Sequence, residues 1–508
     1  MKRKMKNKKE IKKEVWFKNR TELIVFLISF ILAIVFFLWQ RRFFSWDFSV
    51  YMMNAEHFLG LEGSYYFEWL RPPLVPALLM LFRPLGRTFS AYAFVVFCTC
   101  FYFFSLKLFH DKFLRKLKYS EVFYLFSINP FVLTYGLGIG TELISLSLIV
   151  LFVVFAFSAG SFAFFGASML ARYSNIILLP VVFLSKNIKK ILIGIGIIIL
   201  MFLPWLFTNY LFTGHALTSL GDYYALNSLE QAPPTFELRK LFFYLLLTTN
   251  ICLPFLIFGI FSVISKKNKK NQEKGKKPLI ILLMLALLTL LMYEFSSIKQ
   301  PRFLFNLSLP ICYFSIFGFN FVIGKIKNKK AMKTVKLVLI VLLLISVISA
   351  FVFAEIINSR GFIKEEKIIK QLIGKIDNCT IASDLWVYFD WYGKKASPAP
   401  LALNLTKTGK PQIFSMISEG YNIILFKNFE PFAKNKKFIE ELESYTIENN
   451  DDYIWLRDKS KCKIDEKINN TFIDSLKPFG EFPENFGGCD ALMLKLKLRK
   501  LCEIFKFL

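Results

Sequence analysis

Histidine is almost absent from this sequence, with only three residues among 508. None of the eight cysteines falls in a CxxC-type spacing, so the usual Cys/His zinc site is excluded. We find no internal repeat, which removes the symmetry on which many secondary transporters are built. Acidic residues are also few, 37 against 65 Lys and Arg, and the formal net charge is +28.

Apolar residues are abundant, by contrast. They make up 55% of the chain, the mean hydropathy is +0.46, and a soluble protein of this length should be less apolar. Since a membrane helix needs about 20 mostly apolar residues, we predict spans near 22–39, 88–106, 120–136, 141–158, 190–208, 238–264, 278–295, 302–324 and 333–354. No small-residue cleavage site follows the first, which is therefore predicted to remain as an anchor.

The distribution of basic residues predicts the orientation. Segments 1–20, 107–118, 186–190, 265–277 and 325–336 hold 31 Lys and Arg, whereas the alternate loops hold 9. The positive-inside rule therefore predicts a multi-pass protein with a cytoplasmic N-terminus and an external C-terminal domain. We expect its location to be the plasma membrane. Because the charge lies along this cytoplasmic rim, where anionic lipid attracts it, we expect membrane lipid as a partner and no nucleic acid.

One apolar stretch, 161–184, is too short for two full spans, yet the orientation requires an even number of crossings there. Arg172 interrupts it near its middle. We predict two short half-depth helices with Arg172 near the turn, because broken helices are tolerated where protein or a cavity lines them. The fold expected is a polytopic α-helical membrane protein with about eleven membrane segments.

Three regions are predicted: a cytoplasmic basic tail 1–20, a membrane domain 21–354 with outer loops 40–87 and 209–237, and an external domain 355–508. Residues 72–82 read as a helix lying in the membrane interface. In the last region, helical spacing at 362–374 and 431–444 alternates with β-rich runs at 379–382, 423–426 and 453–456, which favours a small α/β domain. One or two disulfides are expected among its cysteines, which are Cys379, Cys462, Cys489 and Cys502.

Two carboxylates are the catalytic candidates. Asp47 follows the first span among aromatic residues, where desolvation would raise its proton affinity and suit a general base. The alternative is an ordinary interfacial acid. Glu142 opens the fourth span, where it would face the same cavity or simply compensate a helix dipole.

Three arginines are candidates for a phosphate, because a guanidinium forms paired charge-assisted hydrogen bonds. Prolines directly after Arg71 would hold it at a set height, and Arg302 lies at the outer mouth of a later span. Both could instead be interfacial anchors. Arg172 is the sharpest signal, because charge at membrane depth is costly and usually faces a cavity or a partner. It could bind an anion or pair with Glu142.

In its order of motifs the chain resembles the GT-C glycosyltransferases, which include protein O-mannosyltransferases and the aminoarabinose transferases of lipid A. The resemblance covers residues 20 to about 355. Its carriers are Asp47 with Tyr51 and Ala55, Arg71-Pro72-Pro73-Leu74, Glu142, Leu203-Pro204-Trp205, Asn209-Tyr210, Gly214, and Lys299 to Arg302 with Pro310.

The resemblance implies transfer of a sugar from a polyprenyl- or dolichyl-phosphate donor to a hydroxyl acceptor, with inversion. Asp47 would then be the base, Glu142 its assistant, and Arg71 the phosphate ligand, with Arg172 and Arg302 as further candidates. Trp46, Tyr51, Glu56 and His57 are predicted to contact substrate, although a solvated loop is the alternative for the last two. No cofactor is required, and a divalent cation between the two acids is compatible with them. The rival hypotheses are a lipid-linked-sugar flippase and a non-catalytic cell-envelope scaffold.

Overall fold

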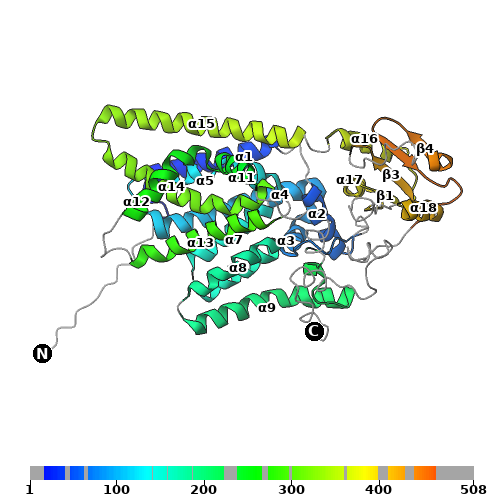
Figure 1. The fold of residues 1–508 in the computed structure, drawn as a ribbon, viewed down its shortest axis with the longest axis horizontal. Coiled ribbons are helices and arrows are strands. Elements are labelled where there is room, and N and C mark those ends of the chain that lie inside the picture. The colour runs from blue at the N-terminus through cyan, green and yellow to red at the C-terminus, as the bar shows by residue number, and fades with distance from the viewer. Residues whose placement is uncertain are drawn as a thin grey trace.

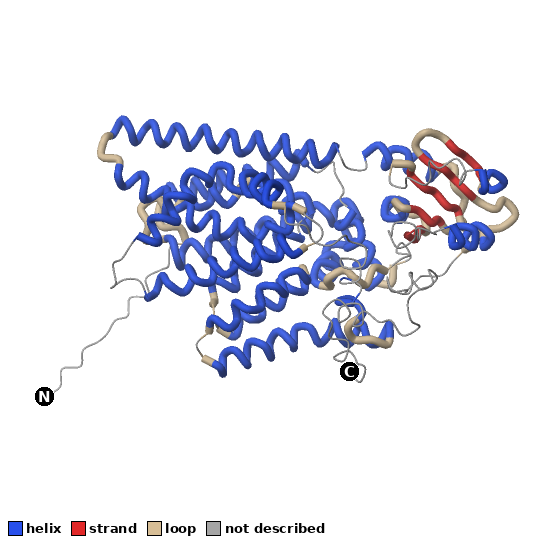
Figure 2. Tube along the Cα trace, viewed as in Figure 1, coloured by secondary structure: helices blue, strands red, loops and turns tan. Residues whose placement is uncertain are grey.

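The computed structural model describes residues 16–40, 46–61, 67–139, 141–156, 158–185, 187–221, 223, 237–265, 273–296, 300–359, 363–398, 410–428 and 440–464. A helical bundle forms most of the molecule, and a small α/β region lies at one end of it, beside α2 and α3 (Figure 1). All strands of the described residues belong to that region (Figure 2).

Five described helices are long and apolar enough to cross a membrane, or six if one bent pair is counted as a span. The predicted total of eleven segments therefore remains a prediction. The first half of the bundle comprises α1 (Arg20–Gln40), α2 (Trp46–Phe58), α3 (Leu74–Phe82), η1 (Arg83–Leu85), α4 (Arg87–Phe109), η2 (His110–Leu114), α5 (Val122–Ser127), η3 (Val132–Gly136), α6 (Leu137–Ile139), α7 (Thr141–Val154), α8 (Ala159–Ala171) and η4 (Tyr173–Leu184).

The second half comprises α9 (Ile188–Thr213), α11 (Leu238–Thr249), η5 (Asn250–Cys252), α12 (Leu253–Ser265), α13 (Glu273–Phe295), η6 (Pro301–Leu307), α14 (Ser308–Lys325) and α15 (Lys329–Ser359). Their apolar faces share one continuous core that runs through the bundle. α12 and α14 approach so closely that a Cβ built on Gly318 would lie 1.8 Å from the carbonyl oxygen of Phe255.

Two predicted spans are sharply broken or bent. Region 120–136 breaks after α5, because Pro130 cannot continue the helix and the Asn129 side chain instead accepts hydrogen bonds from the amides of Phe131 and Val132. Region 238–264 bends by 85° between α11 and η5. Asn250 lies at this bend with φ 24° and ψ −107°, which is outside the left-handed helical region.

The break at Arg172 is where the sequence predicts it. α8 ends at Ala171, Arg172 is extended (φ −151°, ψ 112°), and η4 begins at Tyr173 as a 3₁₀ helix of 12 residues. The helix predicted at 72–82 is also present as α3, which Pro73 precedes at the N-cap position.

The α/β region contains α16 (Ile363–Ile373), β1 (Ile381–Ser383), α17 (Trp386–Trp391), β2 (Ala396–Pro398), α18 (Lys410–Glu419), β3 (Asn422–Phe426), η8 (Glu443–Tyr445), β4 (Thr446–Asn449) and β5 (Tyr453–Leu456). The sheet order is β2-β1-β3-β5-β4. β1 pairs in parallel with β2 and β3, and β5 pairs antiparallel with β3 and β4. The three predicted strands are β1, β3 and β5, whereas most of predicted helix 431–444 lies outside the described residues.

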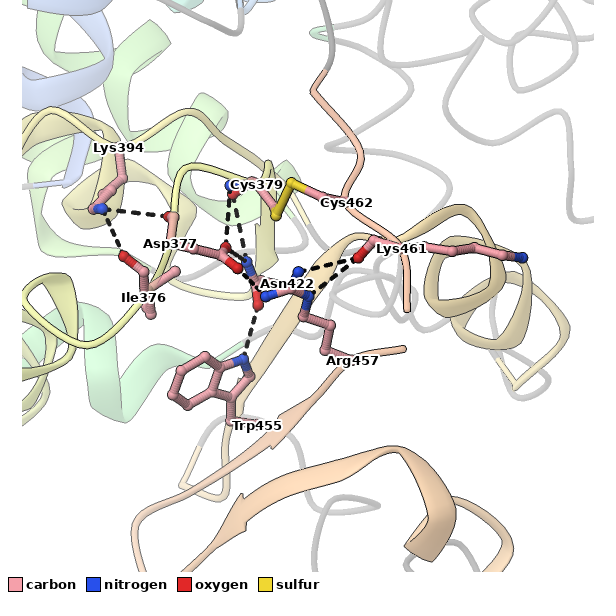
Figure 3. Close-up of a disulfide and its surroundings, with 9 residues drawn as sticks. All are labelled: Ile376, Asp377, Cys379, Lys394, Asn422, Trp455, Arg457, Lys461 and Cys462. Atoms are coloured by element: carbon pink, nitrogen blue, oxygen red, sulfur yellow. Dashed lines mark hydrogen bonds and ion pairs between the residues drawn. A yellow bond between two sulfur atoms is a disulfide. The ribbon is translucent and has the colours of Figure 1, made fainter. Parts of the chain in front are cut away.

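A disulfide between Cys379 and Cys462 joins the segment before β1 to the segment after β5 (Figure 3). Asp377 beside it pairs with Arg457 and accepts a 3.0 Å hydrogen bond from Asn422. The bridge confirms the prediction of a disulfide among the four cysteines of this region. Cys489 and Cys502 lie outside the described residues.

Candidate active site

Asp47 lies in the first turn of α2 and is held by two arginines from distant parts of the chain. Arg71 Nη1 donates to Asp47 Oδ1 at 2.7 Å, and Arg302 Nη1 donates to Oδ2. The second hydrogen-bonding edge of Arg71 pairs through Nε with Glu68. These side chains are 14–29% exposed, so the cluster is largely desolvated.

The arginines reverse the expected electrostatics of Asp47. Burial raises the pKa of this carboxyl, but attraction by Arg302 and Arg71 and the hydrogen bonds from both outweigh it, and the pKa lies well below its ordinary value. The expectation that desolvation would dominate is therefore wrong. Asp47 is an ionised carboxylate whose two oxygens both accept hydrogen bonds from guanidinium groups.

Glu142 and Arg172 form a second ion pair. Arg172 Nη1 lies 3.0 Å from Glu142 Oε1, while the hydroxyl of Thr141 donates to Oε2 at 2.6 Å. The extended break between α8 and η4 places Arg172 there, and only 3% of the Glu142 side chain is exposed. Of the two predicted roles of Arg172, the structure shows the pairing.

Tyr51 connects the two ion pairs. It lies one turn after Asp47 on α2, and its ring centroid is 5.7 Å from Arg71 Cζ. Burial raises the pKa of its phenol; smaller effects come from Arg71, Asp47, Glu142 and Arg172, so the charges of both pairs act on this side chain. The five predicted charged residues and Tyr51 therefore make up one neighbourhood.

A chain of hydrogen bonds connects the elements that hold these charged residues. Asn306 Nδ2 donates to Asn175 Oδ1 at 3.0 Å, and Asn175 Nδ2 donates to Ser145 at 2.7 Å. These hydrogen bonds join η6, η4 and α7. Arg302 lies in η6 and Glu142 in α7, while Arg172 directly precedes η4. Sequence analysis missed these hydrogen bonds, although each asparagine follows its arginine by about one helical turn.

Other predicted substrate residues face elsewhere. Trp46 meets Trp386 and Tyr388 edge-on at centroid distances of 6.1 and 6.2 Å, in contact with α17. The Glu56 side chain is fully buried and pairs with arginines outside the Asp47 cluster. His57 packs on Phe67 at 4.8 Å. No ion pair described here joins Glu56 to the Asp47 cluster.

Two crystal structures of one known protein have a fold similar to that of this chain. Neither a family model nor a curated protein matches the sequence. The ArnT of Cupriavidus metallidurans, crystallised with undecaprenyl phosphate, superposes with a TM-score of 0.56 over 86% of this chain and 96% of that chain, at 10% identity. Its apo structure gives 0.57 over 85% and 97%, also at 10% identity. The chain has the ArnT fold.

This likeness confirms the fold that the resemblance predicted, because ArnT is a GT-C aminoarabinose transferase. Together with the apolar helices, it supports an integral membrane protein. The later motifs of the resemblance have structural roles in the ArnT-like bundle. Trp205 donates to the Tyr173 hydroxyl at 2.7 Å and stacks on Trp69 at 5.8 Å. Gly214 ends α9 in the left-handed conformation, with φ 76°.

A divalent cation between Asp47 and Glu142 does not fit this arrangement. Both oxygens of Asp47 are taken by arginines, and those of Glu142 by Arg172 and Thr141. The donor set instead suits an anion. Arg302 Nε is buried and has no hydrogen-bond partner among the described residues, which leaves one guanidinium edge to receive an oxygen.

Proposed function

We propose that this protein transfers a sugar from a polyprenyl-phosphate donor to a hydroxyl acceptor. The observation that carries the proposal is the convergence of Arg71, Arg172 and Arg302 on the carboxylates of Asp47 and Glu142, within the ArnT fold. The ArnT crystal structure contains undecaprenyl phosphate, which supports a lipid phosphate as the ligand of these arginines. We propose that the protein lies in the plasma membrane, with its N-terminus in the cytoplasm and its α/β region on the outer side.

Donor binding would rearrange the Asp47 cluster. A phosphodiester accepts the same guanidinium N–H groups that Asp47 holds, and the unpartnered Nε of Arg302 gives it a first point of attachment. As Arg71 and Arg302 turn to the phosphate, Asp47 loses the two cations that lower its pKa. The carboxylate then becomes the stronger base that the reaction needs, and it does so only when the donor is in place.

The chemical step follows from these positions. The acceptor oxygen attacks the anomeric carbon, its proton passes to Asp47, and the bond between that carbon and the phosphate oxygen breaks. The departing polyprenyl phosphate gains one negative charge, which Arg71 and Arg302 stabilise. One displacement inverts the anomeric configuration. Glu142, held by Arg172, would orient the acceptor, and no metal takes part in this scheme.

Sugar transfer in liposomes tests the proposal. Purified wild type, Asp47→Asn and the surface control Asp452→Asn would each receive radiolabelled polyprenyl-phosphate sugars and membrane extract as acceptor source. Label should move with wild type and the control, and fall by roughly a hundredfold or more with Asp47→Asn. Full transfer by Asp47→Asn would exclude Asp47 as the base. Movement of uncleaved donor across the bilayer would favour a flippase. Donor binding with neither cleavage nor movement would favour a scaffold.

A further inference from the structure

Arg87 connects the α/β region to the helix that carries Asp47. It opens α4, and its Nε and Nη2 donate to the two oxygens of Glu56 at 2.7 and 2.5 Å, a two-pronged pairing. Its Nη1 donates at 2.6 Å to the main-chain oxygens of both Asp390 and Trp391, at the end of α17. One guanidinium thus spans α2 and α17.

The pairing is buried enough to fix both partners. The Glu56 and Asp390 side chains are fully buried and that of Arg87 is 15% exposed. The Arg87 guanidinium also lies over the Trp391 ring, with Cζ 5.7 Å from its centroid. Because breaking a buried ion pair leaves an uncompensated charge, these contacts separate only at substantial cost.

A second contact lies at the opposite end of α2. Trp46, next to Asp47, packs on Trp386 and Tyr388 of α17. Glu56 lies nine residues after Asp47, which is about 14 Å along an α-helix. α17 therefore contacts α2 beside Asp47 and, through Arg87, near the other end of the helix.

We infer that Arg87 is a positioning residue: by locking α17 onto Glu56 it sets the position of α2, and hence the direction in which the Asp47 carboxylate points. The α/β region thereby becomes part of the catalytic apparatus without touching substrate. The inference rests on the proposed function, since it assigns a role within the same site. A misplacement of about 1 Å can cost a hundredfold in rate, so loosening this contact should slow turnover.

Arg83 supplies a matched control. Its Nε also pairs with Glu56, at 2.6 Å, but among the described residues its side chain has no hydrogen bond or ion pair with α17. Arg83→Gln and Arg87→Gln therefore each remove one positive charge from the same carboxylate, and only the second also removes the link to the α/β region.

The test combines turnover with amide hydrogen exchange on the full-length protein in detergent. Arg87→Gln should lower kcat roughly tenfold to a hundredfold, leave the affinity for undecaprenyl phosphate unchanged, and speed exchange of the α2 amides. Arg83→Gln should lower kcat and speed α2 exchange much less. Arg87→Lys keeps the positive charge but lacks the planar guanidinium, and its effects should be intermediate.

Equal exchange in α2 for Arg87→Gln and Arg83→Gln would overturn the inference, as would a kcat like wild type in Arg87→Gln. A parallel loss of affinity for undecaprenyl phosphate would also overturn it, because that points to general loosening of the fold. Exchange does not depend on catalysis. Failure of wild type to transfer any sugar would therefore refute the proposed function separately, while the exchange data still judge the contact.

Discussion

The exchange of arginines between Asp47 and the donor phosphate predicts two different pH profiles. The dependence of kcat/KM on pH reports the free enzyme, and that of kcat reports the donor complex. In the free enzyme Arg302 and Arg71 keep the pKa of Asp47 below its ordinary value. A depressed pKa means that the stability contributed by ionised Asp47 is present above the unfolded value and is lost only as pH falls through the folded one.

The size of the difference follows from the hydrogen bonds. A hydrogen bond to a charged group contributes about 1.5 to 3 kcal/mol, and each 1.36 kcal/mol corresponds to about one pH unit. When both arginines turn to the phosphate, the apparent pKa of the acid limb of kcat should therefore lie roughly 2 to 4 pH units above that of kcat/KM. The donor phosphodiester does not titrate near neutral pH, so it contributes no limb of its own.

The assay is initial-rate transfer from a radiolabelled polyprenyl-phosphate sugar, measured at saturating and at limiting donor from acid to neutral pH. Arg302→Gln is the informative variant, because it removes one of the two cations and should bring the two acid limbs closer together. Superimposable acid limbs for kcat and kcat/KM in the wild type would refute the arginine exchange. Asp47 would then act in the same electrostatic state with and without donor.

Three further changes have defined outcomes. Gly318→Ala should destabilise the bundle by more than about 2 kcal/mol, because its Cβ would meet the Phe255 carbonyl at 1.8 Å, whereas Gly324→Ala in the same helix, with nothing within 4 Å, should be neutral or stabilising in thermal unfolding. Cys379→Ser opens a loop closed by residues 83 apart and should cost roughly 4 to 5 kcal/mol in the α/β region, measured by denaturant unfolding; an unchanged midpoint contradicts it. Arg172→Gln leaves buried Glu142 without its cation and should lower stability by about 3 to 5 kcal/mol, an effect that Arg172→Gln/Glu142→Gln should partly restore.

Local features of this fold could be predicted from the sequence. Arg172 marks the break between two short helices because a charge cannot lie unpaired in an apolar run, and the prolines after Arg71 mark the start of α3. β3 and β5 were recognised from their apolar runs. Hydropathy alone, however, does not report backbone dihedrals, and the bend at Asn250 inside an apolar stretch was therefore missed.

Contacts between distant residues could not be predicted in this way. Asp47 and Arg302 are 255 positions apart, and the order of motifs places them on one face without stating that they touch. The sequence indicates that Asp47 is desolvated, but it does not give the direction of the net pKa shift, because two arginines come next to this carboxylate only on folding. Nothing in the sequence marks Arg87, since two of its contacts with α17 are to main-chain oxygens and another, to the Asp390 side chain, joins residues 303 positions apart.

The tight winding of η4 changes how far its short sequence reaches. A 3₁₀ helix rises about 2.0 Å per residue, so its 12 residues extend ~24 Å, whereas the same residues as an α-helix would extend ~18 Å. The hydrocarbon layer is about 30 Å thick. A segment too brief to qualify as a span by residue count thus approaches the thickness of the layer in length, and counting residues at α-helical pitch underestimates how far this segment extends.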